Sequence, residues 1–352
     1  MHKSLIEHLV DPESRASLVL TSVEEEHDDQ IISGSLGSSG GASYGIVEGI
    51  PRLVPPADRG QQQTGESFGF KWSQRESYES DAFREQARVW LVQRYGFSSA
   101  DEMRHFFASH RLILDAGCGS GFSTSLWMDH GWRGGSGAEW VGLELSDAID
   151  VARARLGDVD GLHFVQGDVT HLPFPPATFD VAIAEGVLHH TPSTEAAFRS
   201  LAESVAPGGE LLAYVYRRKG PIREFADDHV RAALAAMAPE EAWEALRPLT
   251  ALGEELGRLG ASVTLEDGVP LLGIPAGSYD VQRLFYWHFL KAFWNPEFSF
   301  EENHHVNFDW YAPRYAHRQT EESIREWCRA CGLVIRHLDV QESGFTVRAV
   351  KK

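Results

Sequence analysis

Between Arg111 and Tyr216 the chain alternates short apolar runs with polar or amphipathic segments, and few folds accommodate such a pattern. The apolar runs have the length and composition of buried strands, and they are LILDA, WVGLEL, LHFVQGD, FDVAIAEGVL and ELLAYVY. Helical patterns lie between several of them, among them FSTSLWMDHG over residues 122–131. The alternation resumes at Thr320 with one helical pattern and the runs LVIRHLDV and FTVRAV. Because strands separated by helices pair in parallel through right-handed crossovers, we predict an α/β protein with a mostly parallel sheet.

The same patterns divide the 352 residues into five segments. Residues 1–57 carry short apolar runs between turns rich in glycine and serine, which is typical of a small β-rich module. Residues 58–110 are predicted as a polar linker to Gln74 followed by helices, and residues 111–217 as the core of the sheet. Residues 218–317, including the aromatic run Tyr279–Trp294, look mostly helical and are predicted to form a cap inserted into the core. Residues 318–352 then supply the last helix and two strands.

Charge and composition exclude several classes of function. The formal net charge is -19, and the acidic excess is spread along the chain. Nucleic-acid binders need basic surfaces to neutralise phosphates, so we expect no nucleic-acid partner. No apolar run approaches the roughly 18 residues of a membrane span, and the N-terminal residues lack the pattern of a secretion signal, so no membrane partner is expected. With only three cysteines a disulfide framework is not expected, and a reducing cytoplasm is the predicted location.

A glycine-rich loop follows the first core strand and opens a helix. It runs Asp115-Ala116-Gly117-Cys118-Gly119-Ser120-Gly121. Glycines allow a sharp turn and a close approach to a ligand, and the helix N-terminus adds N–H donors. A carboxylate at Asp115 would repel a pyrophosphate but would favour a cofactor that carries an ammonium and a sulfonium group. The loop therefore points to a cationic cofactor.

Two further acids end the next strands. Glu144 ends VGLEL, where a carboxylate can accept hydrogen bonds from a ribose diol. Asp168 ends LHFVQGD, where its carboxylate or the nearby backbone can meet the exocyclic amine of adenine. Three acids at successive strand ends lie at one edge of a parallel sheet, so they predict a site for a cationic adenosine cofactor.

Together these segments resemble the class I S-adenosylmethionine-dependent methyltransferases. LDAGCGSG is similar to the first motif of that family, GLELSDAIDVARAR to its ribose-binding segment, and APGGELLAYVY to the turn after the core. GDVTHLPFPPATFDVAIAEGVLHHT is similar to the adenine segment of the branch that includes ubiquinone/menaquinone C-methyltransferases and many small-molecule methyltransferases. The resemblance covers residues 111–217 and 320–352. It implies a Rossmann-like sheet of seven strands whose last strand is antiparallel, with S-adenosyl-L-methionine as cofactor.

The resemblance also implies a role for each matching residue. Asp115 and Gly117 approach the methionine end of the cofactor, with Cys118, Gly119 and Gly121 in the same loop. Glu144 and Leu145 bind the ribose, Asp168 and Val169 contact adenine, and Glu185 and Gly186 line the methionine side. For Glu185, an acid that simply ends a strand remains the alternative.

The N-terminal module carries a second resemblance. YGIVEGIPRLV is similar to the end of a small zinc-ribbon module that precedes or activates some methyltransferases. The positions that would hold its Cys-x-x-Cys pairs are Asp11 and Ser14, then Gly37 and Gly40. Without thiolates a tetrahedral zinc site cannot form, so we expect a degenerate, metal-free module.

Candidate catalytic residues come from two places. His190 follows the fourth strand, where its imidazole could accept a proton from the substrate or could simply line the pocket. His305 and Tyr311 lie in the polar and aromatic stretch ENHHVNFDWYAPRYAHR of the cap, and we predict that they act on the acceptor. The alternatives for this stretch are a metal site and an ordered segment that ties the cap to the core. SFGFKWS, residues 67–73, offers aromatic rings that could cap the cofactor or pack on the sheet, and Cys328 and Cys331 are expected to pack in the core.

The predicted activity is transfer of a methyl group to an oxygen, nitrogen, carbon or sulfur atom of a small molecule, such as a secondary metabolite. Most of the catalysis would be proximity and orientation. An NAD-type dehydrogenase shares the glycine loop and the acid at the second strand but is disfavoured by Asp115. A non-catalytic binding protein that keeps the methyltransferase fold is the other alternative.

Overall fold

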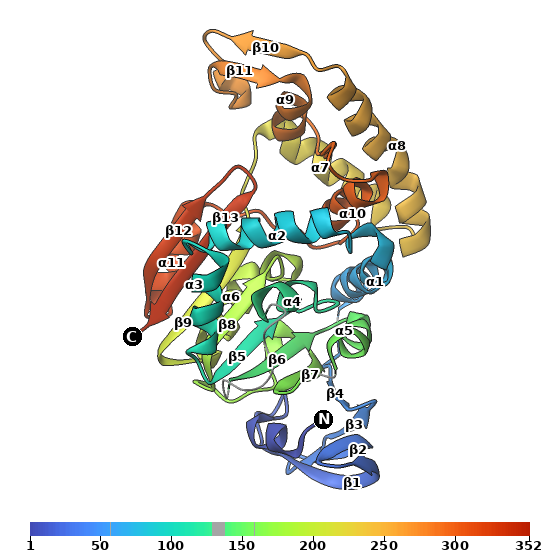
Figure 1. Ribbon diagram of the computed structural model, residues 1–352, viewed down its shortest axis with the longest axis vertical. Helices are drawn as coiled ribbons and strands as arrows, with labels where there is room; N and C mark the ends of the chain where they lie inside the picture. Colours follow the sequence, from blue (N-terminus) through green and yellow to red (C-terminus); the bar gives the residue numbers. More distant parts are fainter. Residues whose placement is uncertain (57, 129–137, 158) are drawn as a thin grey trace.

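The computed structural model of the chain describes residues 1–56, 58–128, 138–157 and 159–352. A mixed sheet with helices on both faces occupies the middle of the molecule, the N-terminal module lies at one end, and the cap lies at the other (Figure 1). In the described parts of the chain no helix is both long and apolar enough to cross a membrane.

The core sheet confirms the predicted fold class. Its strands are β5 (Leu112–Ala116), β6 (Glu139–Glu144), β7 (Leu162–Gly167), β8 (Phe179–Glu185), β9 (Val205–Tyr216), β12 (Leu333–Val340) and β13 (Gly344–Lys351). They lie in the order β7-β6-β5-β8-β9-β13-β12. The last strand, β13, runs antiparallel to both of its neighbours, as the resemblance implied.

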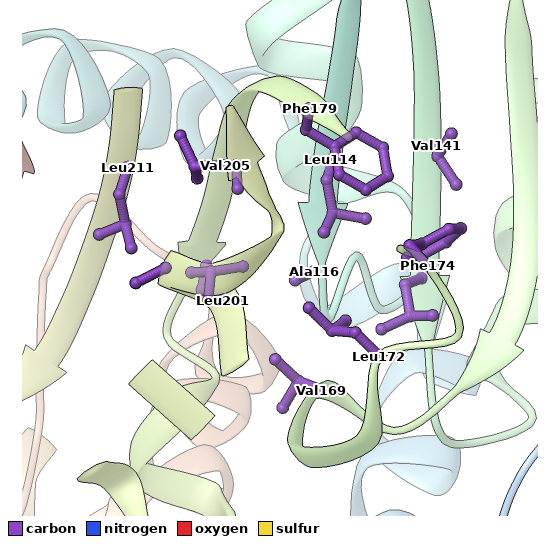
Figure 2. Close-up of a cluster of buried hydrophobic side chains, with 14 of the residues drawn as sticks. Leu114, Ala116, Val141, Val169, Leu172, Phe174, Phe179, Leu201, Val205 and Leu211 are labelled. Atoms are coloured by element: carbon purple, nitrogen blue, oxygen red, sulfur yellow. The ribbon is translucent and has the colours of Figure 1, made fainter. Parts of the chain in front are cut away.

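Helices cover both faces of this sheet because its strands are apolar on both sides. One face packs against α2 (Asp81–Arg94), α3 (Ala100–Ala108), α4 (Phe122–Met128) and α5 (Ala148–Leu156), and the other against α6 (Thr194–Ser204) and α11 (Glu321–Ala330). Figure 2 shows part of the hydrophobic core on the face covered by α6 and α11, in which Leu114 of β5 lies beside Phe179 of β8. The part of the predicted helix over 129–131 lies outside the described residues.

The N-terminal module extends the sheet to eleven strands. It contains the short helix η1 (Lys3–His8) and the strands β1 (Leu18–His27), β2 (Gln30–Ser38), β3 (Ser43–Val47) and β4 (Ile50–Leu53). Strand β4 pairs in parallel with β7 through Arg52 and Leu53. The expectation of seven strands was therefore too low, because the β-rich module satisfies the edge of the core sheet instead of folding apart from it.

The segment predicted as a linker is mostly helical. Helix α1 (Arg59–Ser73) begins at Asp58, whose carboxylate accepts hydrogen bonds from the backbone of Gly60 and Gln61. Its buried residues are Gln61, Thr64, Ser67 and Lys71, all of them polar. The hydrophobic pattern missed this helix because the face that it buries is polar. The short helix η2 (Arg75–Ser77) then leads to α2.

The cap contains the predicted helices and one unpredicted hairpin. Its helices are α7 (Pro221–Leu234), α8 (Pro239–Arg258), η5 (Pro270–Leu272), α9 (Val281–His288) and α10 (Phe300–Tyr311), and its strands β10 (Ser262–Leu265) and β11 (Gly277–Asp280) pair antiparallel. The prediction of a helix to Trp294 was wrong, since α9 ends at His288. Beyond it, side chains bind the backbone in place of helical hydrogen bonds: Gln282 donates to the Ala292 carbonyl, and Asn307 accepts from the Phe293 N–H.

Candidate functional site

A cavity of about 680 Å³ lies between the core sheet and the cap. The ends of β6, β7 and β8 form its floor, α1 and α2 form walls, and α9 and α10 contribute the side of the cap. Ligands of open α/β sheets bind at the carboxyl ends of the strands, which is where this cavity lies. In Figure 1, α1, α2 and α10 lie between the sheet and the outer part of the cap.

The glycine loop requires its glycines. Gly117, Gly119 and Gly121 adopt φ angles of +82°, +55° and +72°, which side chains disfavour. A Cβ atom at Gly117 would clash with Val187, and one at Gly119 would lie 2.6 Å from Nε1 of Trp72. The loop is thus held between the end of β8 and α1, and Gly117 lines the cavity.

Cys118 takes part in the loop through its backbone. Its N–H and that of Gly117 both donate to the Leu143 carbonyl, at 3.0 and 2.6 Å. The side chain is buried against Gly142, and burial raises the pKa of the thiol well above its usual value. Cys118 therefore fixes the loop to β6 and is not a reactive thiol.

Glu144 is held rigidly at the end of β6. Its Oε2 accepts the Gly119 N–H at 3.1 Å, and its Oε1 accepts the backbone N–H and the hydroxyl of Ser146 at 2.9 and 2.7 Å. A carboxylate has about four acceptor positions, so one on Oε2 remains for a ligand. Glu144 and Leu145 both line the cavity.

Asp168 and Val169 form the next part of the floor. The Asp168 carboxylate accepts the Thr170 N–H at 2.8 Å and so caps the short helix η3 (Val169–His171). Both residues line the cavity, and Val169 is buried. The apolar side chain beside a fixed carboxylate suits a flat, polar-edged ring such as adenine.

Carboxylates gather at the methionine end predicted from the sequence. Asp115 is fully buried and accepts a hydrogen bond of 2.6 Å from the Thr124 hydroxyl. Burial, opposed by that hydrogen bond and aided by the charges of Glu185 and Glu144, raises the pKa of Asp115 to about 7. Glu185 also binds Arg94, and it accepts the Tyr95 hydroxyl at 2.6 Å. A ligand with an ammonium and a sulfonium group would offset this excess of negative charge, so the residues present fit S-adenosylmethionine.

His190 lies on the short helix η4 (Leu188–His190), with its ring in the cavity wall. Its Nδ1 lies 2.6 Å from the Tyr315 carbonyl, which fixes the tautomer with the proton on Nδ1. The other nitrogen, Nε2, is buried and has no partner among the described residues. Burial lowers the pKa of His190 to about 4, so the ring is neutral at pH 7 and Nε2 is a hydrogen-bond acceptor.

The two candidate catalytic residues in the cap, His305 and Tyr311, have different positions relative to the cavity. His305 lines the cavity, with Nδ1 2.8 Å from the Ser77 hydroxyl and its ring beside Trp72 and Tyr78. Tyr311 does not line the cavity: its hydroxyl donates to buried Asp227 at 2.7 Å. A catalytic role for Tyr311 is therefore not supported, because helix α10 turns this side chain towards α7 and away from the cavity.

Helix α10 instead presents Asp309, a residue not singled out from the sequence as catalytic. Its carboxylate binds Lys71 of α1 and accepts the Tyr216 hydroxyl at 2.8 Å. Burial alone would raise the pKa of Asp309, but Lys71, His190 and Lys291 hold it well below its usual range. A sequence signal for this helix existed in Ser299 and Glu302, which form a capping box.

No group of three or more His, Cys, Asp or Glu side chains in the described residues is placed to hold a metal ion. Cys328 is buried in the core, and Cys331 packs against the same cluster. The packing interpretation of this pair is confirmed.

Three of the four positions compared with a zinc ribbon, Asp11, Ser14 and Gly40, lie at a hydrogen-bonded centre. Asp11 accepts hydroxyl hydrogen bonds from Ser14, Ser38 and Tyr44 at 2.8, 3.1 and 2.9 Å. A Cβ atom on Gly40 would lie 3.7 Å from the Ser14 hydroxyl. Opposed by burial, these hydrogen bonds lower the pKa of Asp11 to about 2.

Comparison with known proteins shows what the core is similar to. Residues 114–213 match the model of a family described as "Methyltransferase domain". The chain is 30% identical over 116 residues to malonyl-[acyl-carrier protein] O-methyltransferase of Serratia marcescens, which covers 33% of this chain and 42% of that protein. It is 31% identical over 154 residues to trans-aconitate 2-methyltransferase of Afipia carboxidovorans, covering 40% of this chain and 57% of that one.

These matches are partial. The chain spans between 26% and 42% of the length of three curated relatives, which include the Serratia protein and fatty-acid O-methyltransferase of Mycolicibacterium smegmatis. Among solved structures, magnesium protoporphyrin IX methyltransferase of Synechocystis with bound SAM is similar at 13% identity. That match covers 85% of this chain and 100% of the other, with a TM-score of 0.42. The cap and the N-terminal module lie outside the matched family segment.

Proposed function

We propose that this chain, which carries a class I S-adenosylmethionine-dependent methyltransferase domain, transfers a methyl group to a small molecule bound beneath its cap. S-adenosylmethionine is the cofactor of this domain. The observation that carries the proposal is a single cavity that joins seven of the eleven predicted cofactor residues to side chains of the cap. The seven are Gly117, Glu144, Leu145, Asp168, Val169, Glu185 and Gly186, whereas Asp115, Cys118, Gly119 and Gly121 lie behind this lining. A methyl donor and an acceptor bound in one cavity would react much faster than in solution, because they are held close together and in the right orientation.

The cofactor would lie along the ends of the core strands. Glu144 and Leu145 would bind the ribose, and Asp168 and Val169 the adenine, because all four line one side of the cavity. Asp115, Gly117, Glu185 and Gly186 would surround the methionine end, with Cys118, Gly119 and Gly121 shaping the loop. When bound, the sulfonium supplies a methyl group that is already activated for displacement.

Two histidine side chains, one from the core and one from the cap, would orient the acceptor. His190 lines the cavity and its Nε2 has no partner among the described residues, so we infer that Nε2 would accept a hydrogen bond from an acceptor hydroxyl or amine. With a pKa of about 4 it is a weak base, and its role is to orient the attacking atom more than to hold a proton. His305 forms part of the same wall, although its Nδ1 is engaged by Ser77.

The ring of Trp72 would cover the loop from above. Its Nε1 edge is packed on Gly119, and it contacts Phe122 and His305. Water excluded by this aromatic cover cannot compete with the acceptor for the methyl group. The aromatic segment upstream of the core thus has a use in the proposed reaction as well as in packing.

For the N-terminal module we propose a metal-free ribbon. Hydrogen bonds from Ser14, Ser38 and Tyr44 to Asp11 hold together the loops that a metal would otherwise join. The module pairs with β7 and buries its edge, so its contribution is to the stability of the cofactor floor.

The finer assignments belong to the same proposal. A cavity lined by aromatic rings would accept the ring of a quinone or of a secondary metabolite, which agrees with the resemblance to the quinone C-methyltransferase branch. We propose a cytoplasmic protein that acts on neither nucleic acid nor membranes, in agreement with its net charge of -19.

The test is transfer of label from S-[methyl-³H]adenosylmethionine to small molecules in an extract of the source cells, with His190→Ala as a comparison. We expect labelled product with the wild-type chain and much less with the variant, at a similar affinity for S-adenosylhomocysteine. If no labelled small molecule forms, or if the label appears only on macromolecules, the proposal is wrong.

A further inference from the structure

The end of the cavity beneath the cap is basic. Lys219, Arg223 and Lys291 all line it, and all three surround the ring of Trp310. The Nζ atoms of Lys291 and Lys219 lie 4.7 and 6.0 Å from the centroid of that ring, and the Cζ atom of Arg223 lies 5.3 Å from it. Three cations therefore meet within the reach of one ligand group, in a chain whose net charge is -19.

The buried carboxylate of Asp227 cannot neutralise all three. Asp227 accepts Arg223 Nε at 2.6 Å, Trp310 Nε1 at 2.8 Å, the Tyr311 hydroxyl at 2.7 Å and the backbone N–H of Lys291 at 3.3 Å. These four donors fill the acceptor positions of one carboxylate. Asp227 thus holds Arg223 in place and has no position left for an ammonium group.

The remaining donors of these three side chains have no carboxylate partner among the described residues. The ammonium group of Lys219 donates to the backbone carbonyls of Glu342 and Ser343, and the described residues include no ion pair for Lys219 or Lys291. One guanidinium nitrogen of Arg223, Nη2, is buried without a partner among them. Asp309 and Asp227 favour the charged form of Lys291 through their charge, without an ion pair to its ammonium group among the described residues. A buried ammonium group without a paired carboxylate is costly, so such a group is retained where a ligand supplies that pair.

The ionisation of the two lysines agrees with this. Burial lowers the pKa of Lys291 to about 7, with Asp309 and Asp227 opposing the shift and Arg223 and Lys71 adding to it. Burial also lowers the pKa of Lys219 to about 7, with Glu342 opposing the shift. An anion bound between them would favour the charged form of both.

Aromatic rings surround the same end. Tyr214, Tyr216, Tyr286, Trp287 and Phe293 line it together with Trp310. Such a wall binds a flat or extended apolar body, and the cations bind a charged group attached to it.

We propose that the methyl acceptor is an apolar or aromatic carboxylic acid whose carboxylate is bound by Lys219, Arg223 and Lys291. This inference rests on the proposed function and names the substrate class of the same site. The two ends of the cavity then carry opposite charges: the carboxylates near the glycine loop receive the cationic donor, and the cations beneath the cap receive the anionic acceptor. The cationic donor is repelled by the cations beneath the cap, and the anionic acceptor is repelled by the carboxylates near the glycine loop, so each ligand binds at its own end.

The test uses matched pairs of acids and amides: benzoate, 2-naphthoate, 3-indolepropionate and decanoate, each with its primary carboxamide. Binding to the full chain saturated with S-adenosylhomocysteine is measured by calorimetry. We expect the acids that fit to bind at least about tenfold more tightly than their amides, since a charge-assisted contact is lost. Lys291→Met and Lys219→Met should each remove most of this preference and leave amide binding within about twofold.

The matched control is Arg258→Gln, which removes one positive charge from an exposed position of the cap. It should leave the preference unchanged, and thermal denaturation checks that each variant is folded. Amides that bind as well as their acids, a preference that survives both lysine variants, or no binding by any acid would each overturn the proposal. If acids bind but S-adenosylhomocysteine does not, the proposed function is wrong and the carboxylate site is supported. If S-adenosylhomocysteine binds but no acid does, the proposed carboxylate site is wrong and the proposed function is unaffected.

Discussion

The affinity for S-adenosylmethionine should fall sharply when the pH is lowered through 7. Burial and the neighbouring carboxylates of Glu185 and Glu144 raise the pKa of Asp115 to about 7, against the hydrogen bond from Thr124. In the unliganded protein Asp115 is therefore mostly protonated below this pH. A cationic donor favours the ionised form, so binding is strongest where the carboxylate is already ionised.

The size of the effect follows from the pKa. With a value of about 7, roughly three quarters of the carboxylate is ionised at pH 7.5 and roughly a tenth at pH 6. If binding requires the ionised form, affinity should drop about eightfold between these two values, or roughly 1.2 kcal/mol. The comparison stays below pH 8 because the α-amino group of the donor loses its own charge near that pH.

The assay is calorimetric titration with S-adenosylmethionine at constant ionic strength, repeated with Asp115→Asn. The asparagine can still accept the Thr124 hydroxyl but has no charge to titrate, so its affinity should be lower at pH 7.5 and nearly constant down to pH 6. The reasoning is refuted if the variant keeps the slope of the wild-type chain, or if the wild-type affinity rises as the pH falls.

Three further outcomes are expected. Glu144→Ala should weaken S-adenosylmethionine binding, measured by calorimetry, about tenfold or more, because a hydrogen bond to a charged acceptor is worth roughly 1.5–3 kcal/mol. The control is Glu139→Ala, at the other end of β6, which should leave the affinity unchanged. Elemental analysis of the purified protein should find far less than one zinc per chain, because hydrogen bonds to Asp11 take the place of a metal; stoichiometric zinc would contradict the metal-free module. Tyr311→Phe should lower the free energy of unfolding by roughly 1–3 kcal/mol, and with it the melting temperature, because buried Asp227 loses a hydrogen bond. The proposed site predicts that His190→Ala lowers methyl transfer much more than Tyr311→Phe does. A melting temperature unchanged by the first change, or activity unchanged by the second, would count against these assignments.

The core could be predicted from the sequence because its signals are local. Each strand is a continuous apolar run, and the glycines at Gly117, Gly119 and Gly121 stand where positive φ angles are needed. The reversal of β13 followed from the family resemblance, since it is not written in any single segment. The order of the strands was not predicted and comes from the structure.

The walls of the cavity could not be predicted in the same way. Helix α1 buries Gln61, Thr64 and Lys71, so its pattern is that of a polar linker. In α10, Asp309 and Tyr311 are only two residues apart, about 200° around the helix, and the sequence does not say which of them faces the cavity. Hydrophobic periodicity locates a core face, whereas α1 buries polar side chains and α10 has the cavity on one side and the polar network around Asp227 on the other.

The cations beneath the cap were missed for a related reason. Lys219, Arg223 and Lys291 come from three separate places in the chain and meet only when β9, α7 and the segment after α9 are folded together. Their sequence neighbours show no basic cluster beyond the short run from Arg217 to Lys219. The convergence of charge is a property of the tertiary structure, and so is the preference for an acidic acceptor that we infer from it.

The measurement that tests the central claim most directly is a pair of calorimetric titrations of the full chain, one with S-adenosylmethionine and one with NADH. The charge at the glycine loop predicts that S-adenosylmethionine binds with one site per chain and that NADH, which carries a pyrophosphate, does not bind. Binding of NADH without binding of S-adenosylmethionine would contradict the account and would favour a dehydrogenase.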